Sequence, residues 1–307
     1  MIGSWLVKDL LAMKAGVVAL VFDRDPNSEL LRSGDIDRIA VVEGALEDFD
    51  TLERAIADHG ADTVFHLGAQ TQVELAYSDP LTTWETNVRG TYNVLEACRR
   101  HAALVERIVV ASSDKAYGDQ EMLPYTEESR LAANYPYDVS KACADLVAQS
   151  YHRTYGLPVA IARCGNTYGG GDLNWNRIVP GTIRSLLEGD PLVVRSDGRY
   201  LRDYVYVRDV SQAYIRVAEA LGRDSIAGEA FNFAHEHPVT VLEVMDAIKR
   251  LMDREEVEPV IENRAVGEIR DQWLSSAKAR ELLGWSPAYD LESGLVETIQ
   301  WYRSFFA

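Results

Sequence analysis

Two short stretches of the sequence carry side chains that can move protons. Ser113-Asp114-Lys115 follows the β-branched run Ile108-Val109-Val110, and Tyr137 and Lys141 come after a short connection. A hydroxyl, a carboxylic acid, a phenol and two amines would then meet at the carboxyl end of a strand and the start of the next helix. Such a set can remove a proton, hold an oxyanion and protonate a leaving group.

The spacing of Tyr137 and Lys141 places both side chains on one face of a helix. A phenol has a pKa of about 10, too high for a base at neutral pH, and a nearby ammonium would lower it. The same pattern occurs on solvated helices, so by itself it leaves a structural role open. The serine-rich strand end upstream favours the interpretation of Tyr137 and Lys141 as active-site residues.

The elements that must position these residues alternate regularly. Apolar β-type runs alternate with helical patterns, which is typical of a parallel sheet covered on both faces. The sequence therefore predicts an α/β fold, a Rossmann-like doubly wound parallel sheet with a smaller C-terminal substrate lobe. We expect strands at 16–22, 39–42, 63–67, 107–110, 159–163, 192–195, 205–207 and 231–233, and helices near 4–14, 49–58, 84–100, 138–155, 178–188, 240–252 and 275–283.

The two lobes are expected to interleave in the sequence. The larger, Rossmann-like lobe takes residues 1–166 and about 204–236, and the smaller lobe takes about 167–203 and 237–307. We expect the ligand site in the cleft between them.

The start of the chain reads like the end of a phosphate-binding glycine loop. Gly3 resembles the last glycine of G-x-G-x-x-G, and Asp23, about 20 residues later, ends the next strand, where an acidic residue accepts from ribose hydroxyls. The first strand and first two glycines of that unit are absent from the sequence. We therefore expect a gap between two neighbouring strands, and we expect the natural protein to begin upstream of Met1.

Composition limits the classes of partner. The net charge of −17 in 307 residues argues against a protein that follows nucleic-acid backbones, but a few local arginines could still bind a small anion. Cys98, Cys143 and Cys164 have no metal-type spacing, so we expect reduced thiols and no metal site. No stretch reaches the roughly 20 apolar residues of a membrane span. A cytoplasmic protein without membrane or nucleic-acid partners is expected.

Further motifs extend from Gly3 to about Phe305 and carry a family resemblance. The chain resembles the extended short-chain dehydrogenase/reductases, the NAD-dependent epimerase/dehydratase family, which act on nucleotide sugars. The resemblance implies NAD as cofactor, a nucleotide-sugar substrate and a homodimer formed through the helices near 84–100 and 138–155. The motifs are His66–Gln70, Asn87–Thr91, Arg163–Gly169, Arg202–Asp209 and Lys278–Trp285.

The resemblance also implies roles for single residues. Ser113 would hydrogen-bond the sugar 4-oxygen, Tyr137 would deprotonate it, and Lys141 would bind the cofactor ribose. Ala45 stands where the family often has an aspartate that contacts adenine, so that contact is lost. The implied cofactor residues are Gly3, Asp23, Leu46, Leu67, Ala69, Asn87, Tyr137 and Lys141; the implied substrate residues are Asn166, Arg177, Arg202 and Arg270, with surface ion pairs as the alternative for Arg202 and Arg270.

Asp114-Lys115 narrows the class of reaction. In the 4,6-dehydratases of the family the corresponding pair is typically Asp-Glu, and the Asp-Lys version, like the stretch 169–180, resembles the enzymes that act on CDP-glucose. The acid would protonate the departing 6-hydroxyl, and Lys115 would remove the C5 proton if its pKa is lowered. A lysine that merely pairs with Asp114 is the alternative. Simple 4-epimerases need no acid at this position.

These residues lead to one functional hypothesis and two rivals. We expect a nucleotide-sugar 4,6-dehydratase with tightly held NAD, and CDP-glucose as its substrate. One rival is a related enzyme, either an NAD-dependent 4-epimerase or a dehydratase for another base or hexose. The other rival is a non-catalytic member of the family used as a binding module, because the phosphate loop is incomplete.

Overall fold

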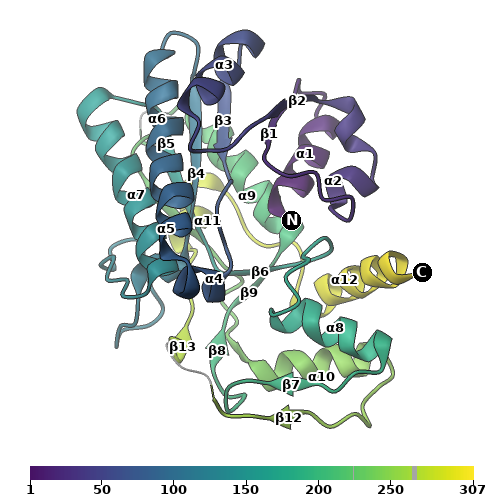
Figure 1. Cartoon of the computed structure of the whole chain (residues 1–307). Helices are drawn as coiled ribbons and strands as arrows, with labels where there is room; N and C mark the ends of the chain where they lie inside the picture. The colour runs from purple at the N-terminus through teal and green to yellow at the C-terminus, as the bar shows by residue number, and fades with distance from the viewer. Residues whose placement is uncertain (224, 265–267) are drawn as a thin grey trace.

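A four-stranded parallel sheet forms the centre of the molecule (Figure 1). The computed structural model describes residues 1–223, 225–264 and 268–307. The sheet has the order β10-β5-β4-β3, and every neighbouring pair in it is parallel. The predicted α/β class with a parallel sheet is confirmed. The strands are β3 (Thr63–His66), β4 (Arg107–Ser113), β5 (Val159–Cys164) and β10 (Ala230–Phe233).

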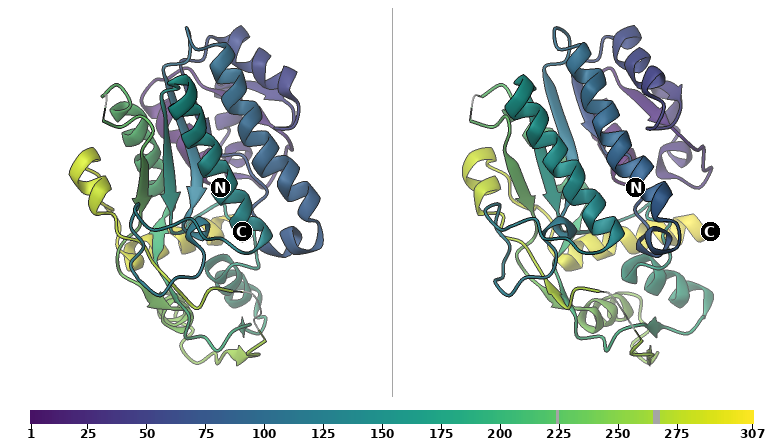
Figure 2. Two further views of the ribbon diagram at one scale, coloured as in Figure 1. Left: turned by 90° about the vertical axis from the view of Figure 1, so that its left-hand side faces the viewer. Right: turned by 60° about the vertical axis from the view of Figure 1, so that its left-hand side comes forward.

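Helices cover both faces of this sheet. Successive residues of β4 point to opposite faces: Val109 joins the core cluster under α9 (Val207–Ala220), and Ile108 and Val110 join the cluster on the other face. There α6 (Gly90–Arg100) and α7 (Pro136–Tyr155) lie side by side over the strands (Figure 2). This double cover explains the continuous apolar runs of the central strands.

The first two strands form a sheet of their own. β1 (Val18–Val21) pairs in parallel with β2 (Ala40–Glu43), and within the described ranges β1 does not pair with β3. The expected gap between two neighbouring strands is confirmed. Every residue of β1 is only partly buried, whereas every residue of β5 is buried. The strand beside the gap is therefore less well covered than the centre of the sheet.

The other end of the molecule is built from helices and very short strands (Figure 1). α8 (Ile178–Glu188), α10 (Val241–Leu251) and α12 (Leu291–Phe306) pack together around a second apolar core. Thr240 and Glu243 form a capping box that starts α10. The short strands are β6 (Asn166–Tyr168), β7 (Val193–Val194), β8 (Leu201–Arg202), β9 (Tyr204–Tyr206), β11 (Val239–Thr240), β12 (Val260–Ile261) and β13 (Asp271–Gln272).

Two long helices are absent from the sequence-based expectations. The run at 205–207 was predicted as a strand, but β9 ends at Tyr206 and α9 begins at Val207, because the apolar run continues directly into the buried face of the helix. α12 was not predicted, although the Asp290 carboxylate accepts from Ser293 N at its start. The predicted lobe boundaries stay a prediction.

The remaining helices are short or pack on the edges. No helix in the described part of the chain is long and apolar enough to cross a membrane. The remaining helices are α1 (Ile2–Ala12), which packs on α9, α2 (Glu29–Arg32), η1 (Asp35–Arg38), α3 (Phe49–His59), α4 (Val73–Ser78), α5 (Pro80–Trp84), η2 (Glu85–Arg89), η3 (Asp114–Tyr117) and α11 (Ala277–Leu283).

A buried ion pair ties β5 to α7 behind the predicted site. The Arg163 guanidinium donates to both oxygens of Asp145, at 2.7 and 3.0 Å, and to the Tyr117 hydroxyl at 2.8 Å. Tyr117 in turn donates to Asn232 Oδ1 on β10. Since Tyr117 is the last residue of η3, this network fixes the segment that carries Asp114 and Lys115.

Asp145→Asn should destabilise the protein strongly. The change leaves the Arg163 charge buried without a counterion, which costs about 3–5 kcal/mol. Thermal melting measures the effect. Glu219→Gln is the control, because its ion pair with Arg216 is exposed and contributes less than about 1 kcal/mol. Equal shifts in Tm for both variants would contradict this account of the network.

Candidate active site

A pocket of about 1050 Å³ opens at the carboxyl ends of β3, β4 and β5. Ligands of open parallel sheets bind at this edge, because the loops that leave the strands there provide the walls. The wall includes Leu67 and Ala69 after β3, the stretch 112–115 at the end of β4, and Asn166 after β5. The predicted proton-transfer residues Ser113, Asp114, Lys115, Tyr137 and Lys141 all line it.

Ser113 caps the short helix that carries the acid and the amine. Its Oγ donates to Asp114 Oδ1 at 3.0 Å and accepts from Lys115 N at 3.2 Å. The Lys115 amine donates to Gln272 Oε1 at 2.6 Å. In the described part of the chain no ion pair joins Lys115 to Asp114, so the structure does not support the alternative in which these two residues simply pair.

Burial away from water shifts the pKa values of Asp114 and Lys115 in opposite directions. Burial raises the pKa of the Asp114 carboxyl, partly opposed by Lys115. Burial lowers the pKa of Lys115, and the neighbouring Arg202 guanidinium lowers it further. A raised carboxyl pKa favours a proton donor and a lowered amine pKa favours a proton acceptor, as a general acid and a general base require.

Tyr137 departs from the expectation about its pKa. Burial raises the pKa of the phenol to about 12, although Arg177 and a hydrogen bond with Ser113 act in the opposite direction. The predicted lowering by Lys141 is therefore wrong for this structure, since burial outweighs the local charges. Lys141 is buried, donates to Ala111 O at 3.1 Å, and has its pKa lowered by burial to about 8.

The predicted cofactor residues divide into two groups. Gly3, Leu67 and Ala69 line the pocket together with Tyr137 and Lys141. Asp23 and Leu46 do not: Asp23 is exposed just beyond β1, and Leu46 packs on glycines. A Cβ on Gly68 or Gly90 would lie 2.9 or 2.7 Å from Leu46 atoms, so Leu46 fills the space beside the strand end.

Asn87 also lies outside the pocket and acts as a brace. Its side chain accepts from Gln70 N and donates to Gln70 O and Ser140 Oγ, at 2.7, 2.9 and 2.9 Å. Its main-chain oxygen accepts from Thr91 Oγ1 at 2.6 Å. Because that bond uses the only proton of the Thr91 hydroxyl, the Nε2 of His66 must donate to Thr91. Burial lowers the pKa of His66 to about 3, which keeps the imidazole neutral.

Three of the four predicted substrate residues line the pocket. Asn166, Arg177 and Arg202 do so, and the Asn166 Nδ2 is buried without a partner in the described part of the chain. Arg202 donates to the carbonyl oxygens of Leu201 and Arg270, each at 2.8 Å, and to that of Ile269. Arg270 is not among the lining residues; its side chain is 66% exposed beside Asp271. The structure therefore does not bring Arg270 to the site.

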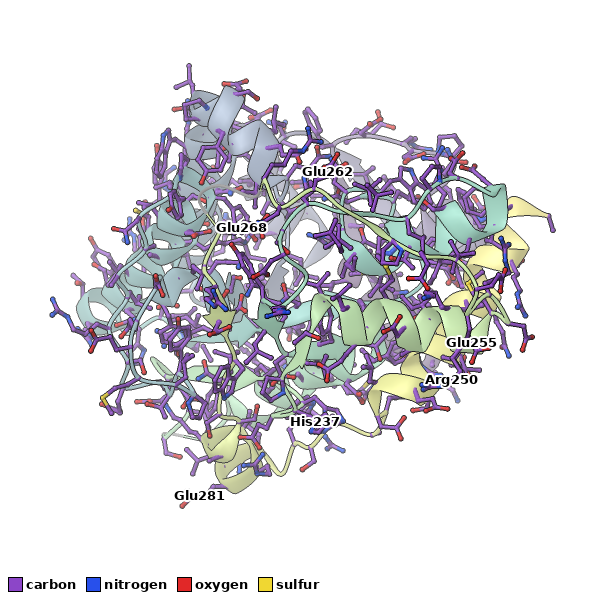
Figure 3. All side chains as sticks on the ribbon, turned by 90° about the horizontal axis from the view of Figure 1, so that it is seen from below. His237, Arg250, Glu255, Glu262, Glu268 and Glu281 are labelled. Atoms are coloured by element: carbon purple, nitrogen blue, oxygen red, sulfur yellow. The ribbon has the colours of Figure 1, made fainter. Side chains whose placement is uncertain are left out.

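The sequence analysis missed several residues in the pocket or in contact with its lining residues. Gln272 holds Lys115, and Asp138, directly after Tyr137, is buried with a pKa raised by burial to about 6. A polar residue in a short strand and a second acid in the Tyr137 motif were the available signals. Glu262 and Glu268, labelled in Figure 3, also line the wall. So do the arginines Arg184, Arg195 and Arg264.

The glycine-rich loop after β6 passes closely between two helices. Trp5 of α1 donates to Gly170 O at 2.8 Å, and a Cβ on Gly170 would lie 2.4 Å from Trp301 of α12. The loop ends at Asp172, which forms an ion pair of 3.0 Å with Arg177 at the pocket. Only glycine allows the backbone to pass this close to Trp301 and still place Asp172 beside Arg177.

Comparisons with known proteins agree with this geometry. A dTDP-glucose 4,6-dehydratase of Xanthomonas campestris pv. campestris is 33% identical over 301 residues, covering 92% of this chain and 84% of the relative. The dTDP-glucose 4,6-dehydratase 1 of Escherichia coli K12 is 30% identical over 296 residues, covering 88% and 80%.

Solved structures overlap along nearly the whole chain. The UDP-glucose 4-epimerase of Thermotoga maritima with UDP-glucose has a TM-score of 0.90 at 27% identity, covering 100% of this chain and 97% of that one. The dTDP-glucose 4,6-dehydratase of Bacillus anthracis in complex with NAD has a TM-score of 0.85 at 28% identity, covering 99% and 94%.

The sheet, the pocket at its carboxyl edge and the Tyr137/Lys141 pair define a Rossmann-like dehydrogenase/reductase class of protein. The family model described as the NAD dependent epimerase/dehydratase family matches residues 1–234. The chain belongs to this family.

Gly170→Ala should disturb the packing of Trp301. The added methyl has no room, and overpacking of this kind costs about 1–3 kcal/mol. We expect a lower Tm and a changed tryptophan fluorescence spectrum. Gly222→Ala is the matched control, because no atom lies within 4 Å of its added Cβ. A Gly170→Ala variant as stable as Gly222→Ala would show that the loop has more room than the structure gives it.

Proposed function

We propose that the chain is an NAD-dependent nucleotide-sugar 4,6-dehydratase. The observation that carries the proposal is the pair Asp114 and Lys115 at the pocket wall, an acid with a raised pKa beside an amine with a lowered one. Loss of hydroxide from C6 needs a proton donor, and removal of the C5 proton needs a base. An enzyme that only inverts C4 needs neither group.

The residues divide the proton transfers among them. Burial raises the pKa of the Tyr137 phenol to about 12, so its action as a base needs the positive charge that oxidised NAD would bring into the pocket, which favours the phenolate. The phenolate of Tyr137 then takes the proton of the sugar 4-hydroxyl, and Ser113, which hydrogen-bonds Tyr137, steadies the oxygen at C4. The C4 ketone acidifies C5–H, and Lys115 removes that proton. Asp114 gives its proton to the C6 oxygen, which leaves as water.

The same residues return the site to its starting state. Lys115 gives its proton back to C5, so that position keeps one hydrogen in the product. Tyr137 then holds one additional proton and Asp114 lacks one. Ser113 Oγ contacts both side chains and provides a route for that proton to return to Asp114. The net change is loss of water, without net oxidation.

The residues at one end of the pocket fit NAD. The Lys141 ammonium has three N–H donors, and within the described residues Ala111 O is the acceptor for one of them, which leaves the others for ribose hydroxyls. Gly3, Leu67 and Ala69 give that end an uncharged wall. Bound NAD supplies the acceptor for the hydrogen that leaves C4 and returns it to C6. Asp23 and Leu46 are not among the residues that line the pocket, so we assign this end to NAD on the basis of Lys141 and Tyr137.

A nucleotide diphosphate suits the other end. Five arginines line the pocket in a chain with a net charge of −17, and the free Asn166 Nδ2 offers a further donor. Guanidinium groups bind diphosphates well because several N–H donors face the oxygens at once. The Asp-Lys pair favours CDP-glucose as the substrate, whereas the relatives named above act on dTDP-glucose by their names. The arginines are Arg177, Arg184, Arg195, Arg202 and Arg264.

A 4-epimerase is the second candidate. The Thermotoga maritima UDP-glucose 4-epimerase overlaps this chain with a TM-score of 0.90. Product analysis separates the two functions, since an epimerase keeps the C6 hydroxyl and a dehydratase removes it.

Lys115→Met and Asp114→Asn should each abolish most of the elimination. Removal of a general acid or base typically costs about 10²–10⁴-fold in rate. The measurement is formation of a 4-keto-6-deoxy sugar from CDP-, dTDP-, UDP- and GDP-glucose, followed by NMR. Lys14→Met, at an exposed lysine away from the pocket, is the control. A folded, NAD-loaded wild type that forms no 4-keto product from any of these sugars would refute the dehydratase assignment.

We also infer a homodimer through α6 and α7. These helices lie side by side (Figure 2), and they expose Tyr92 and Leu146, at 42% and 55%; α5, which contacts α7, exposes Leu81 at 67%. Large apolar side chains left exposed on adjoining helices are typical of a surface that another protein covers.

Leu146→Glu combined with Tyr92→Glu should turn the dimer into a monomer, because the two charges would be buried at the interface. Light scattering after size exclusion measures the mass. Met122→Glu is the control, since Met122 is 85% exposed and lies outside these helices. A monomeric wild type, or a double variant that stays dimeric, would contradict this interface.

A further inference from the structure

Gln272 is a fully buried polar residue that reaches the catalytic segment from the smaller lobe. It lies on β13, which pairs in parallel with β8 so that Gln272 stands opposite Arg202. No role was assigned to it by the sequence motifs. Its side chain contacts both residues of the Asp114-Lys115 pair.

The two hydrogen bonds of Gln272 fix its orientation. Its Oε1 accepts from Lys115 Nζ at 2.6 Å, and its Nε2 donates to the main-chain oxygen of Asp114 at 2.8 Å. The Asp114 carbonyl oxygen can only accept, so the amide nitrogen of Gln272 must face it and the amide oxygen must point the other way. The amide oxygen therefore faces Lys115.

Hydrogen bonds fix the backbone on both sides of Gln272. Tyr125 N donates to Trp273 O at 2.9 Å, and Ser275 N donates to Tyr125 O at 2.8 Å. On the other side the Arg202 guanidinium donates to Arg270 O at 2.8 Å. Gln272 is therefore a fixed point from which the flexible lysine side chain can be oriented.

The acceptor that Gln272 offers is uncharged, and this matters for a base. A neutral amine can donate one N–H to the amide oxygen and keep its lone pair free for a proton of the substrate. A carboxylate at the same place would hold the proton on the amine. The charged groups that face Lys115 from the surrounding elements are Arg202 of β8, Asp114 of η3, Asp138 of α7 and Glu268.

We propose that Gln272 is a positioning residue of the elimination step: its neutral amide oxygen holds the Lys115 amine at the pocket wall so that its lone pair is available to take the C5 proton. The inference rests on the proposed dehydratase function. It adds to the elimination a residue on β13, a strand far along the chain from the segment that carries Asp114 and Lys115.

Two replacements of Gln272 by residues of similar size should shift the pKa of Lys115 in opposite directions. Gln272→Glu adds a negative charge at the amide position and should move the acidic limb of the rate profile for 4-keto product to higher pH, by about 1–3 units. Gln272→Met removes the acceptor and should move the ionisation of Lys115 to lower pH, while the rate falls because the amine is no longer oriented. A residue that only stabilises the fold would shift neither profile.

The ionisation of Lys115 can also be followed without turnover. Acetic anhydride labels unprotonated amines, and peptide mass spectrometry reports the labelling of Lys115 as a function of pH in the full-length, NAD-loaded protein. We expect the labelling midpoint to rise in Gln272→Glu and to fall in Gln272→Met. Gln300→Glu places the same new charge on an exposed position of α12 and should leave the midpoint unchanged.

The outcomes separate the two proposals. Unchanged labelling midpoints and unchanged rate profiles in folded Gln272 variants would overturn the role of Gln272, whatever the wild type does to nucleotide sugars. A wild type without 4-keto product would overturn the dehydratase assignment, and the labelling would still decide whether Gln272 governs Lys115. If Gln272→Glu does not fold, Gln272→Met decides by itself, and an unchanged midpoint there overturns the inference.

Discussion

The burial of Asp114 and Lys115 side by side, with no ion pair between them among the described residues, is the constraint on which the arrangement of the site depends. Two oppositely charged neighbours would ordinarily pair, and each would then be locked in its ionised form. Here Asp114 takes a hydrogen bond from Ser113, and Lys115 donates to Gln272. Keeping the two partners separate needs support from two distant parts of the chain, since Gln272 lies on β13 and Ser113 at the end of β4.

That support is built from buried polar contacts. The hydrogen bonds of Arg163 with Asp145 and Tyr117 fix the last residue of η3. Gln272 donates to the main-chain oxygen of Asp114, the first residue of η3. Each of these groups has a partner, so their burial carries little penalty. The part of the sheet expected to hold the cofactor is organised differently. In the residues that the structure describes, β1 and β3 do not pair, and Leu46 and Asn87 pack at the strand ends and are not among the pocket-lining residues. The proton-transfer residues are thus more firmly held than the sheet around the gap.

Local patterns in the sequence were sufficient for the central sheet and for the proton-transfer residues. Continuous apolar runs predicted β3 to β5, and the position of Ser113 to Lys115 after such a run predicted their place at the sheet edge. The start of α9 was mistaken for part of a strand because its first residue, Val207, continues the apolar run of β9. Arg270 was assigned from the family resemblance, and its side chain is exposed beside Asp271 and is not among the residues that line the pocket.

Other features depend on contacts between distant residues, which no local pattern reveals. Gln272 lies 157 positions from Lys115, and nothing around it in the sequence signals the contact. The pKa of Tyr137 was misjudged for a similar reason: spacing on a helix indicated Lys141, but the extent of burial is a property of the whole pocket.

Transfer of hydrogen within one sugar molecule tests the central claim most directly. The purified, NAD-loaded protein would be incubated with CDP-glucose, and in parallel with dTDP-glucose, carrying deuterium at C4, and the product analysed by NMR. A 4,6-dehydratase should give a 4-keto-6-deoxy sugar with the deuterium at C6. A product that keeps its C6 hydroxyl and carries the deuterium at C4, or substrate recovered unchanged, would contradict the account.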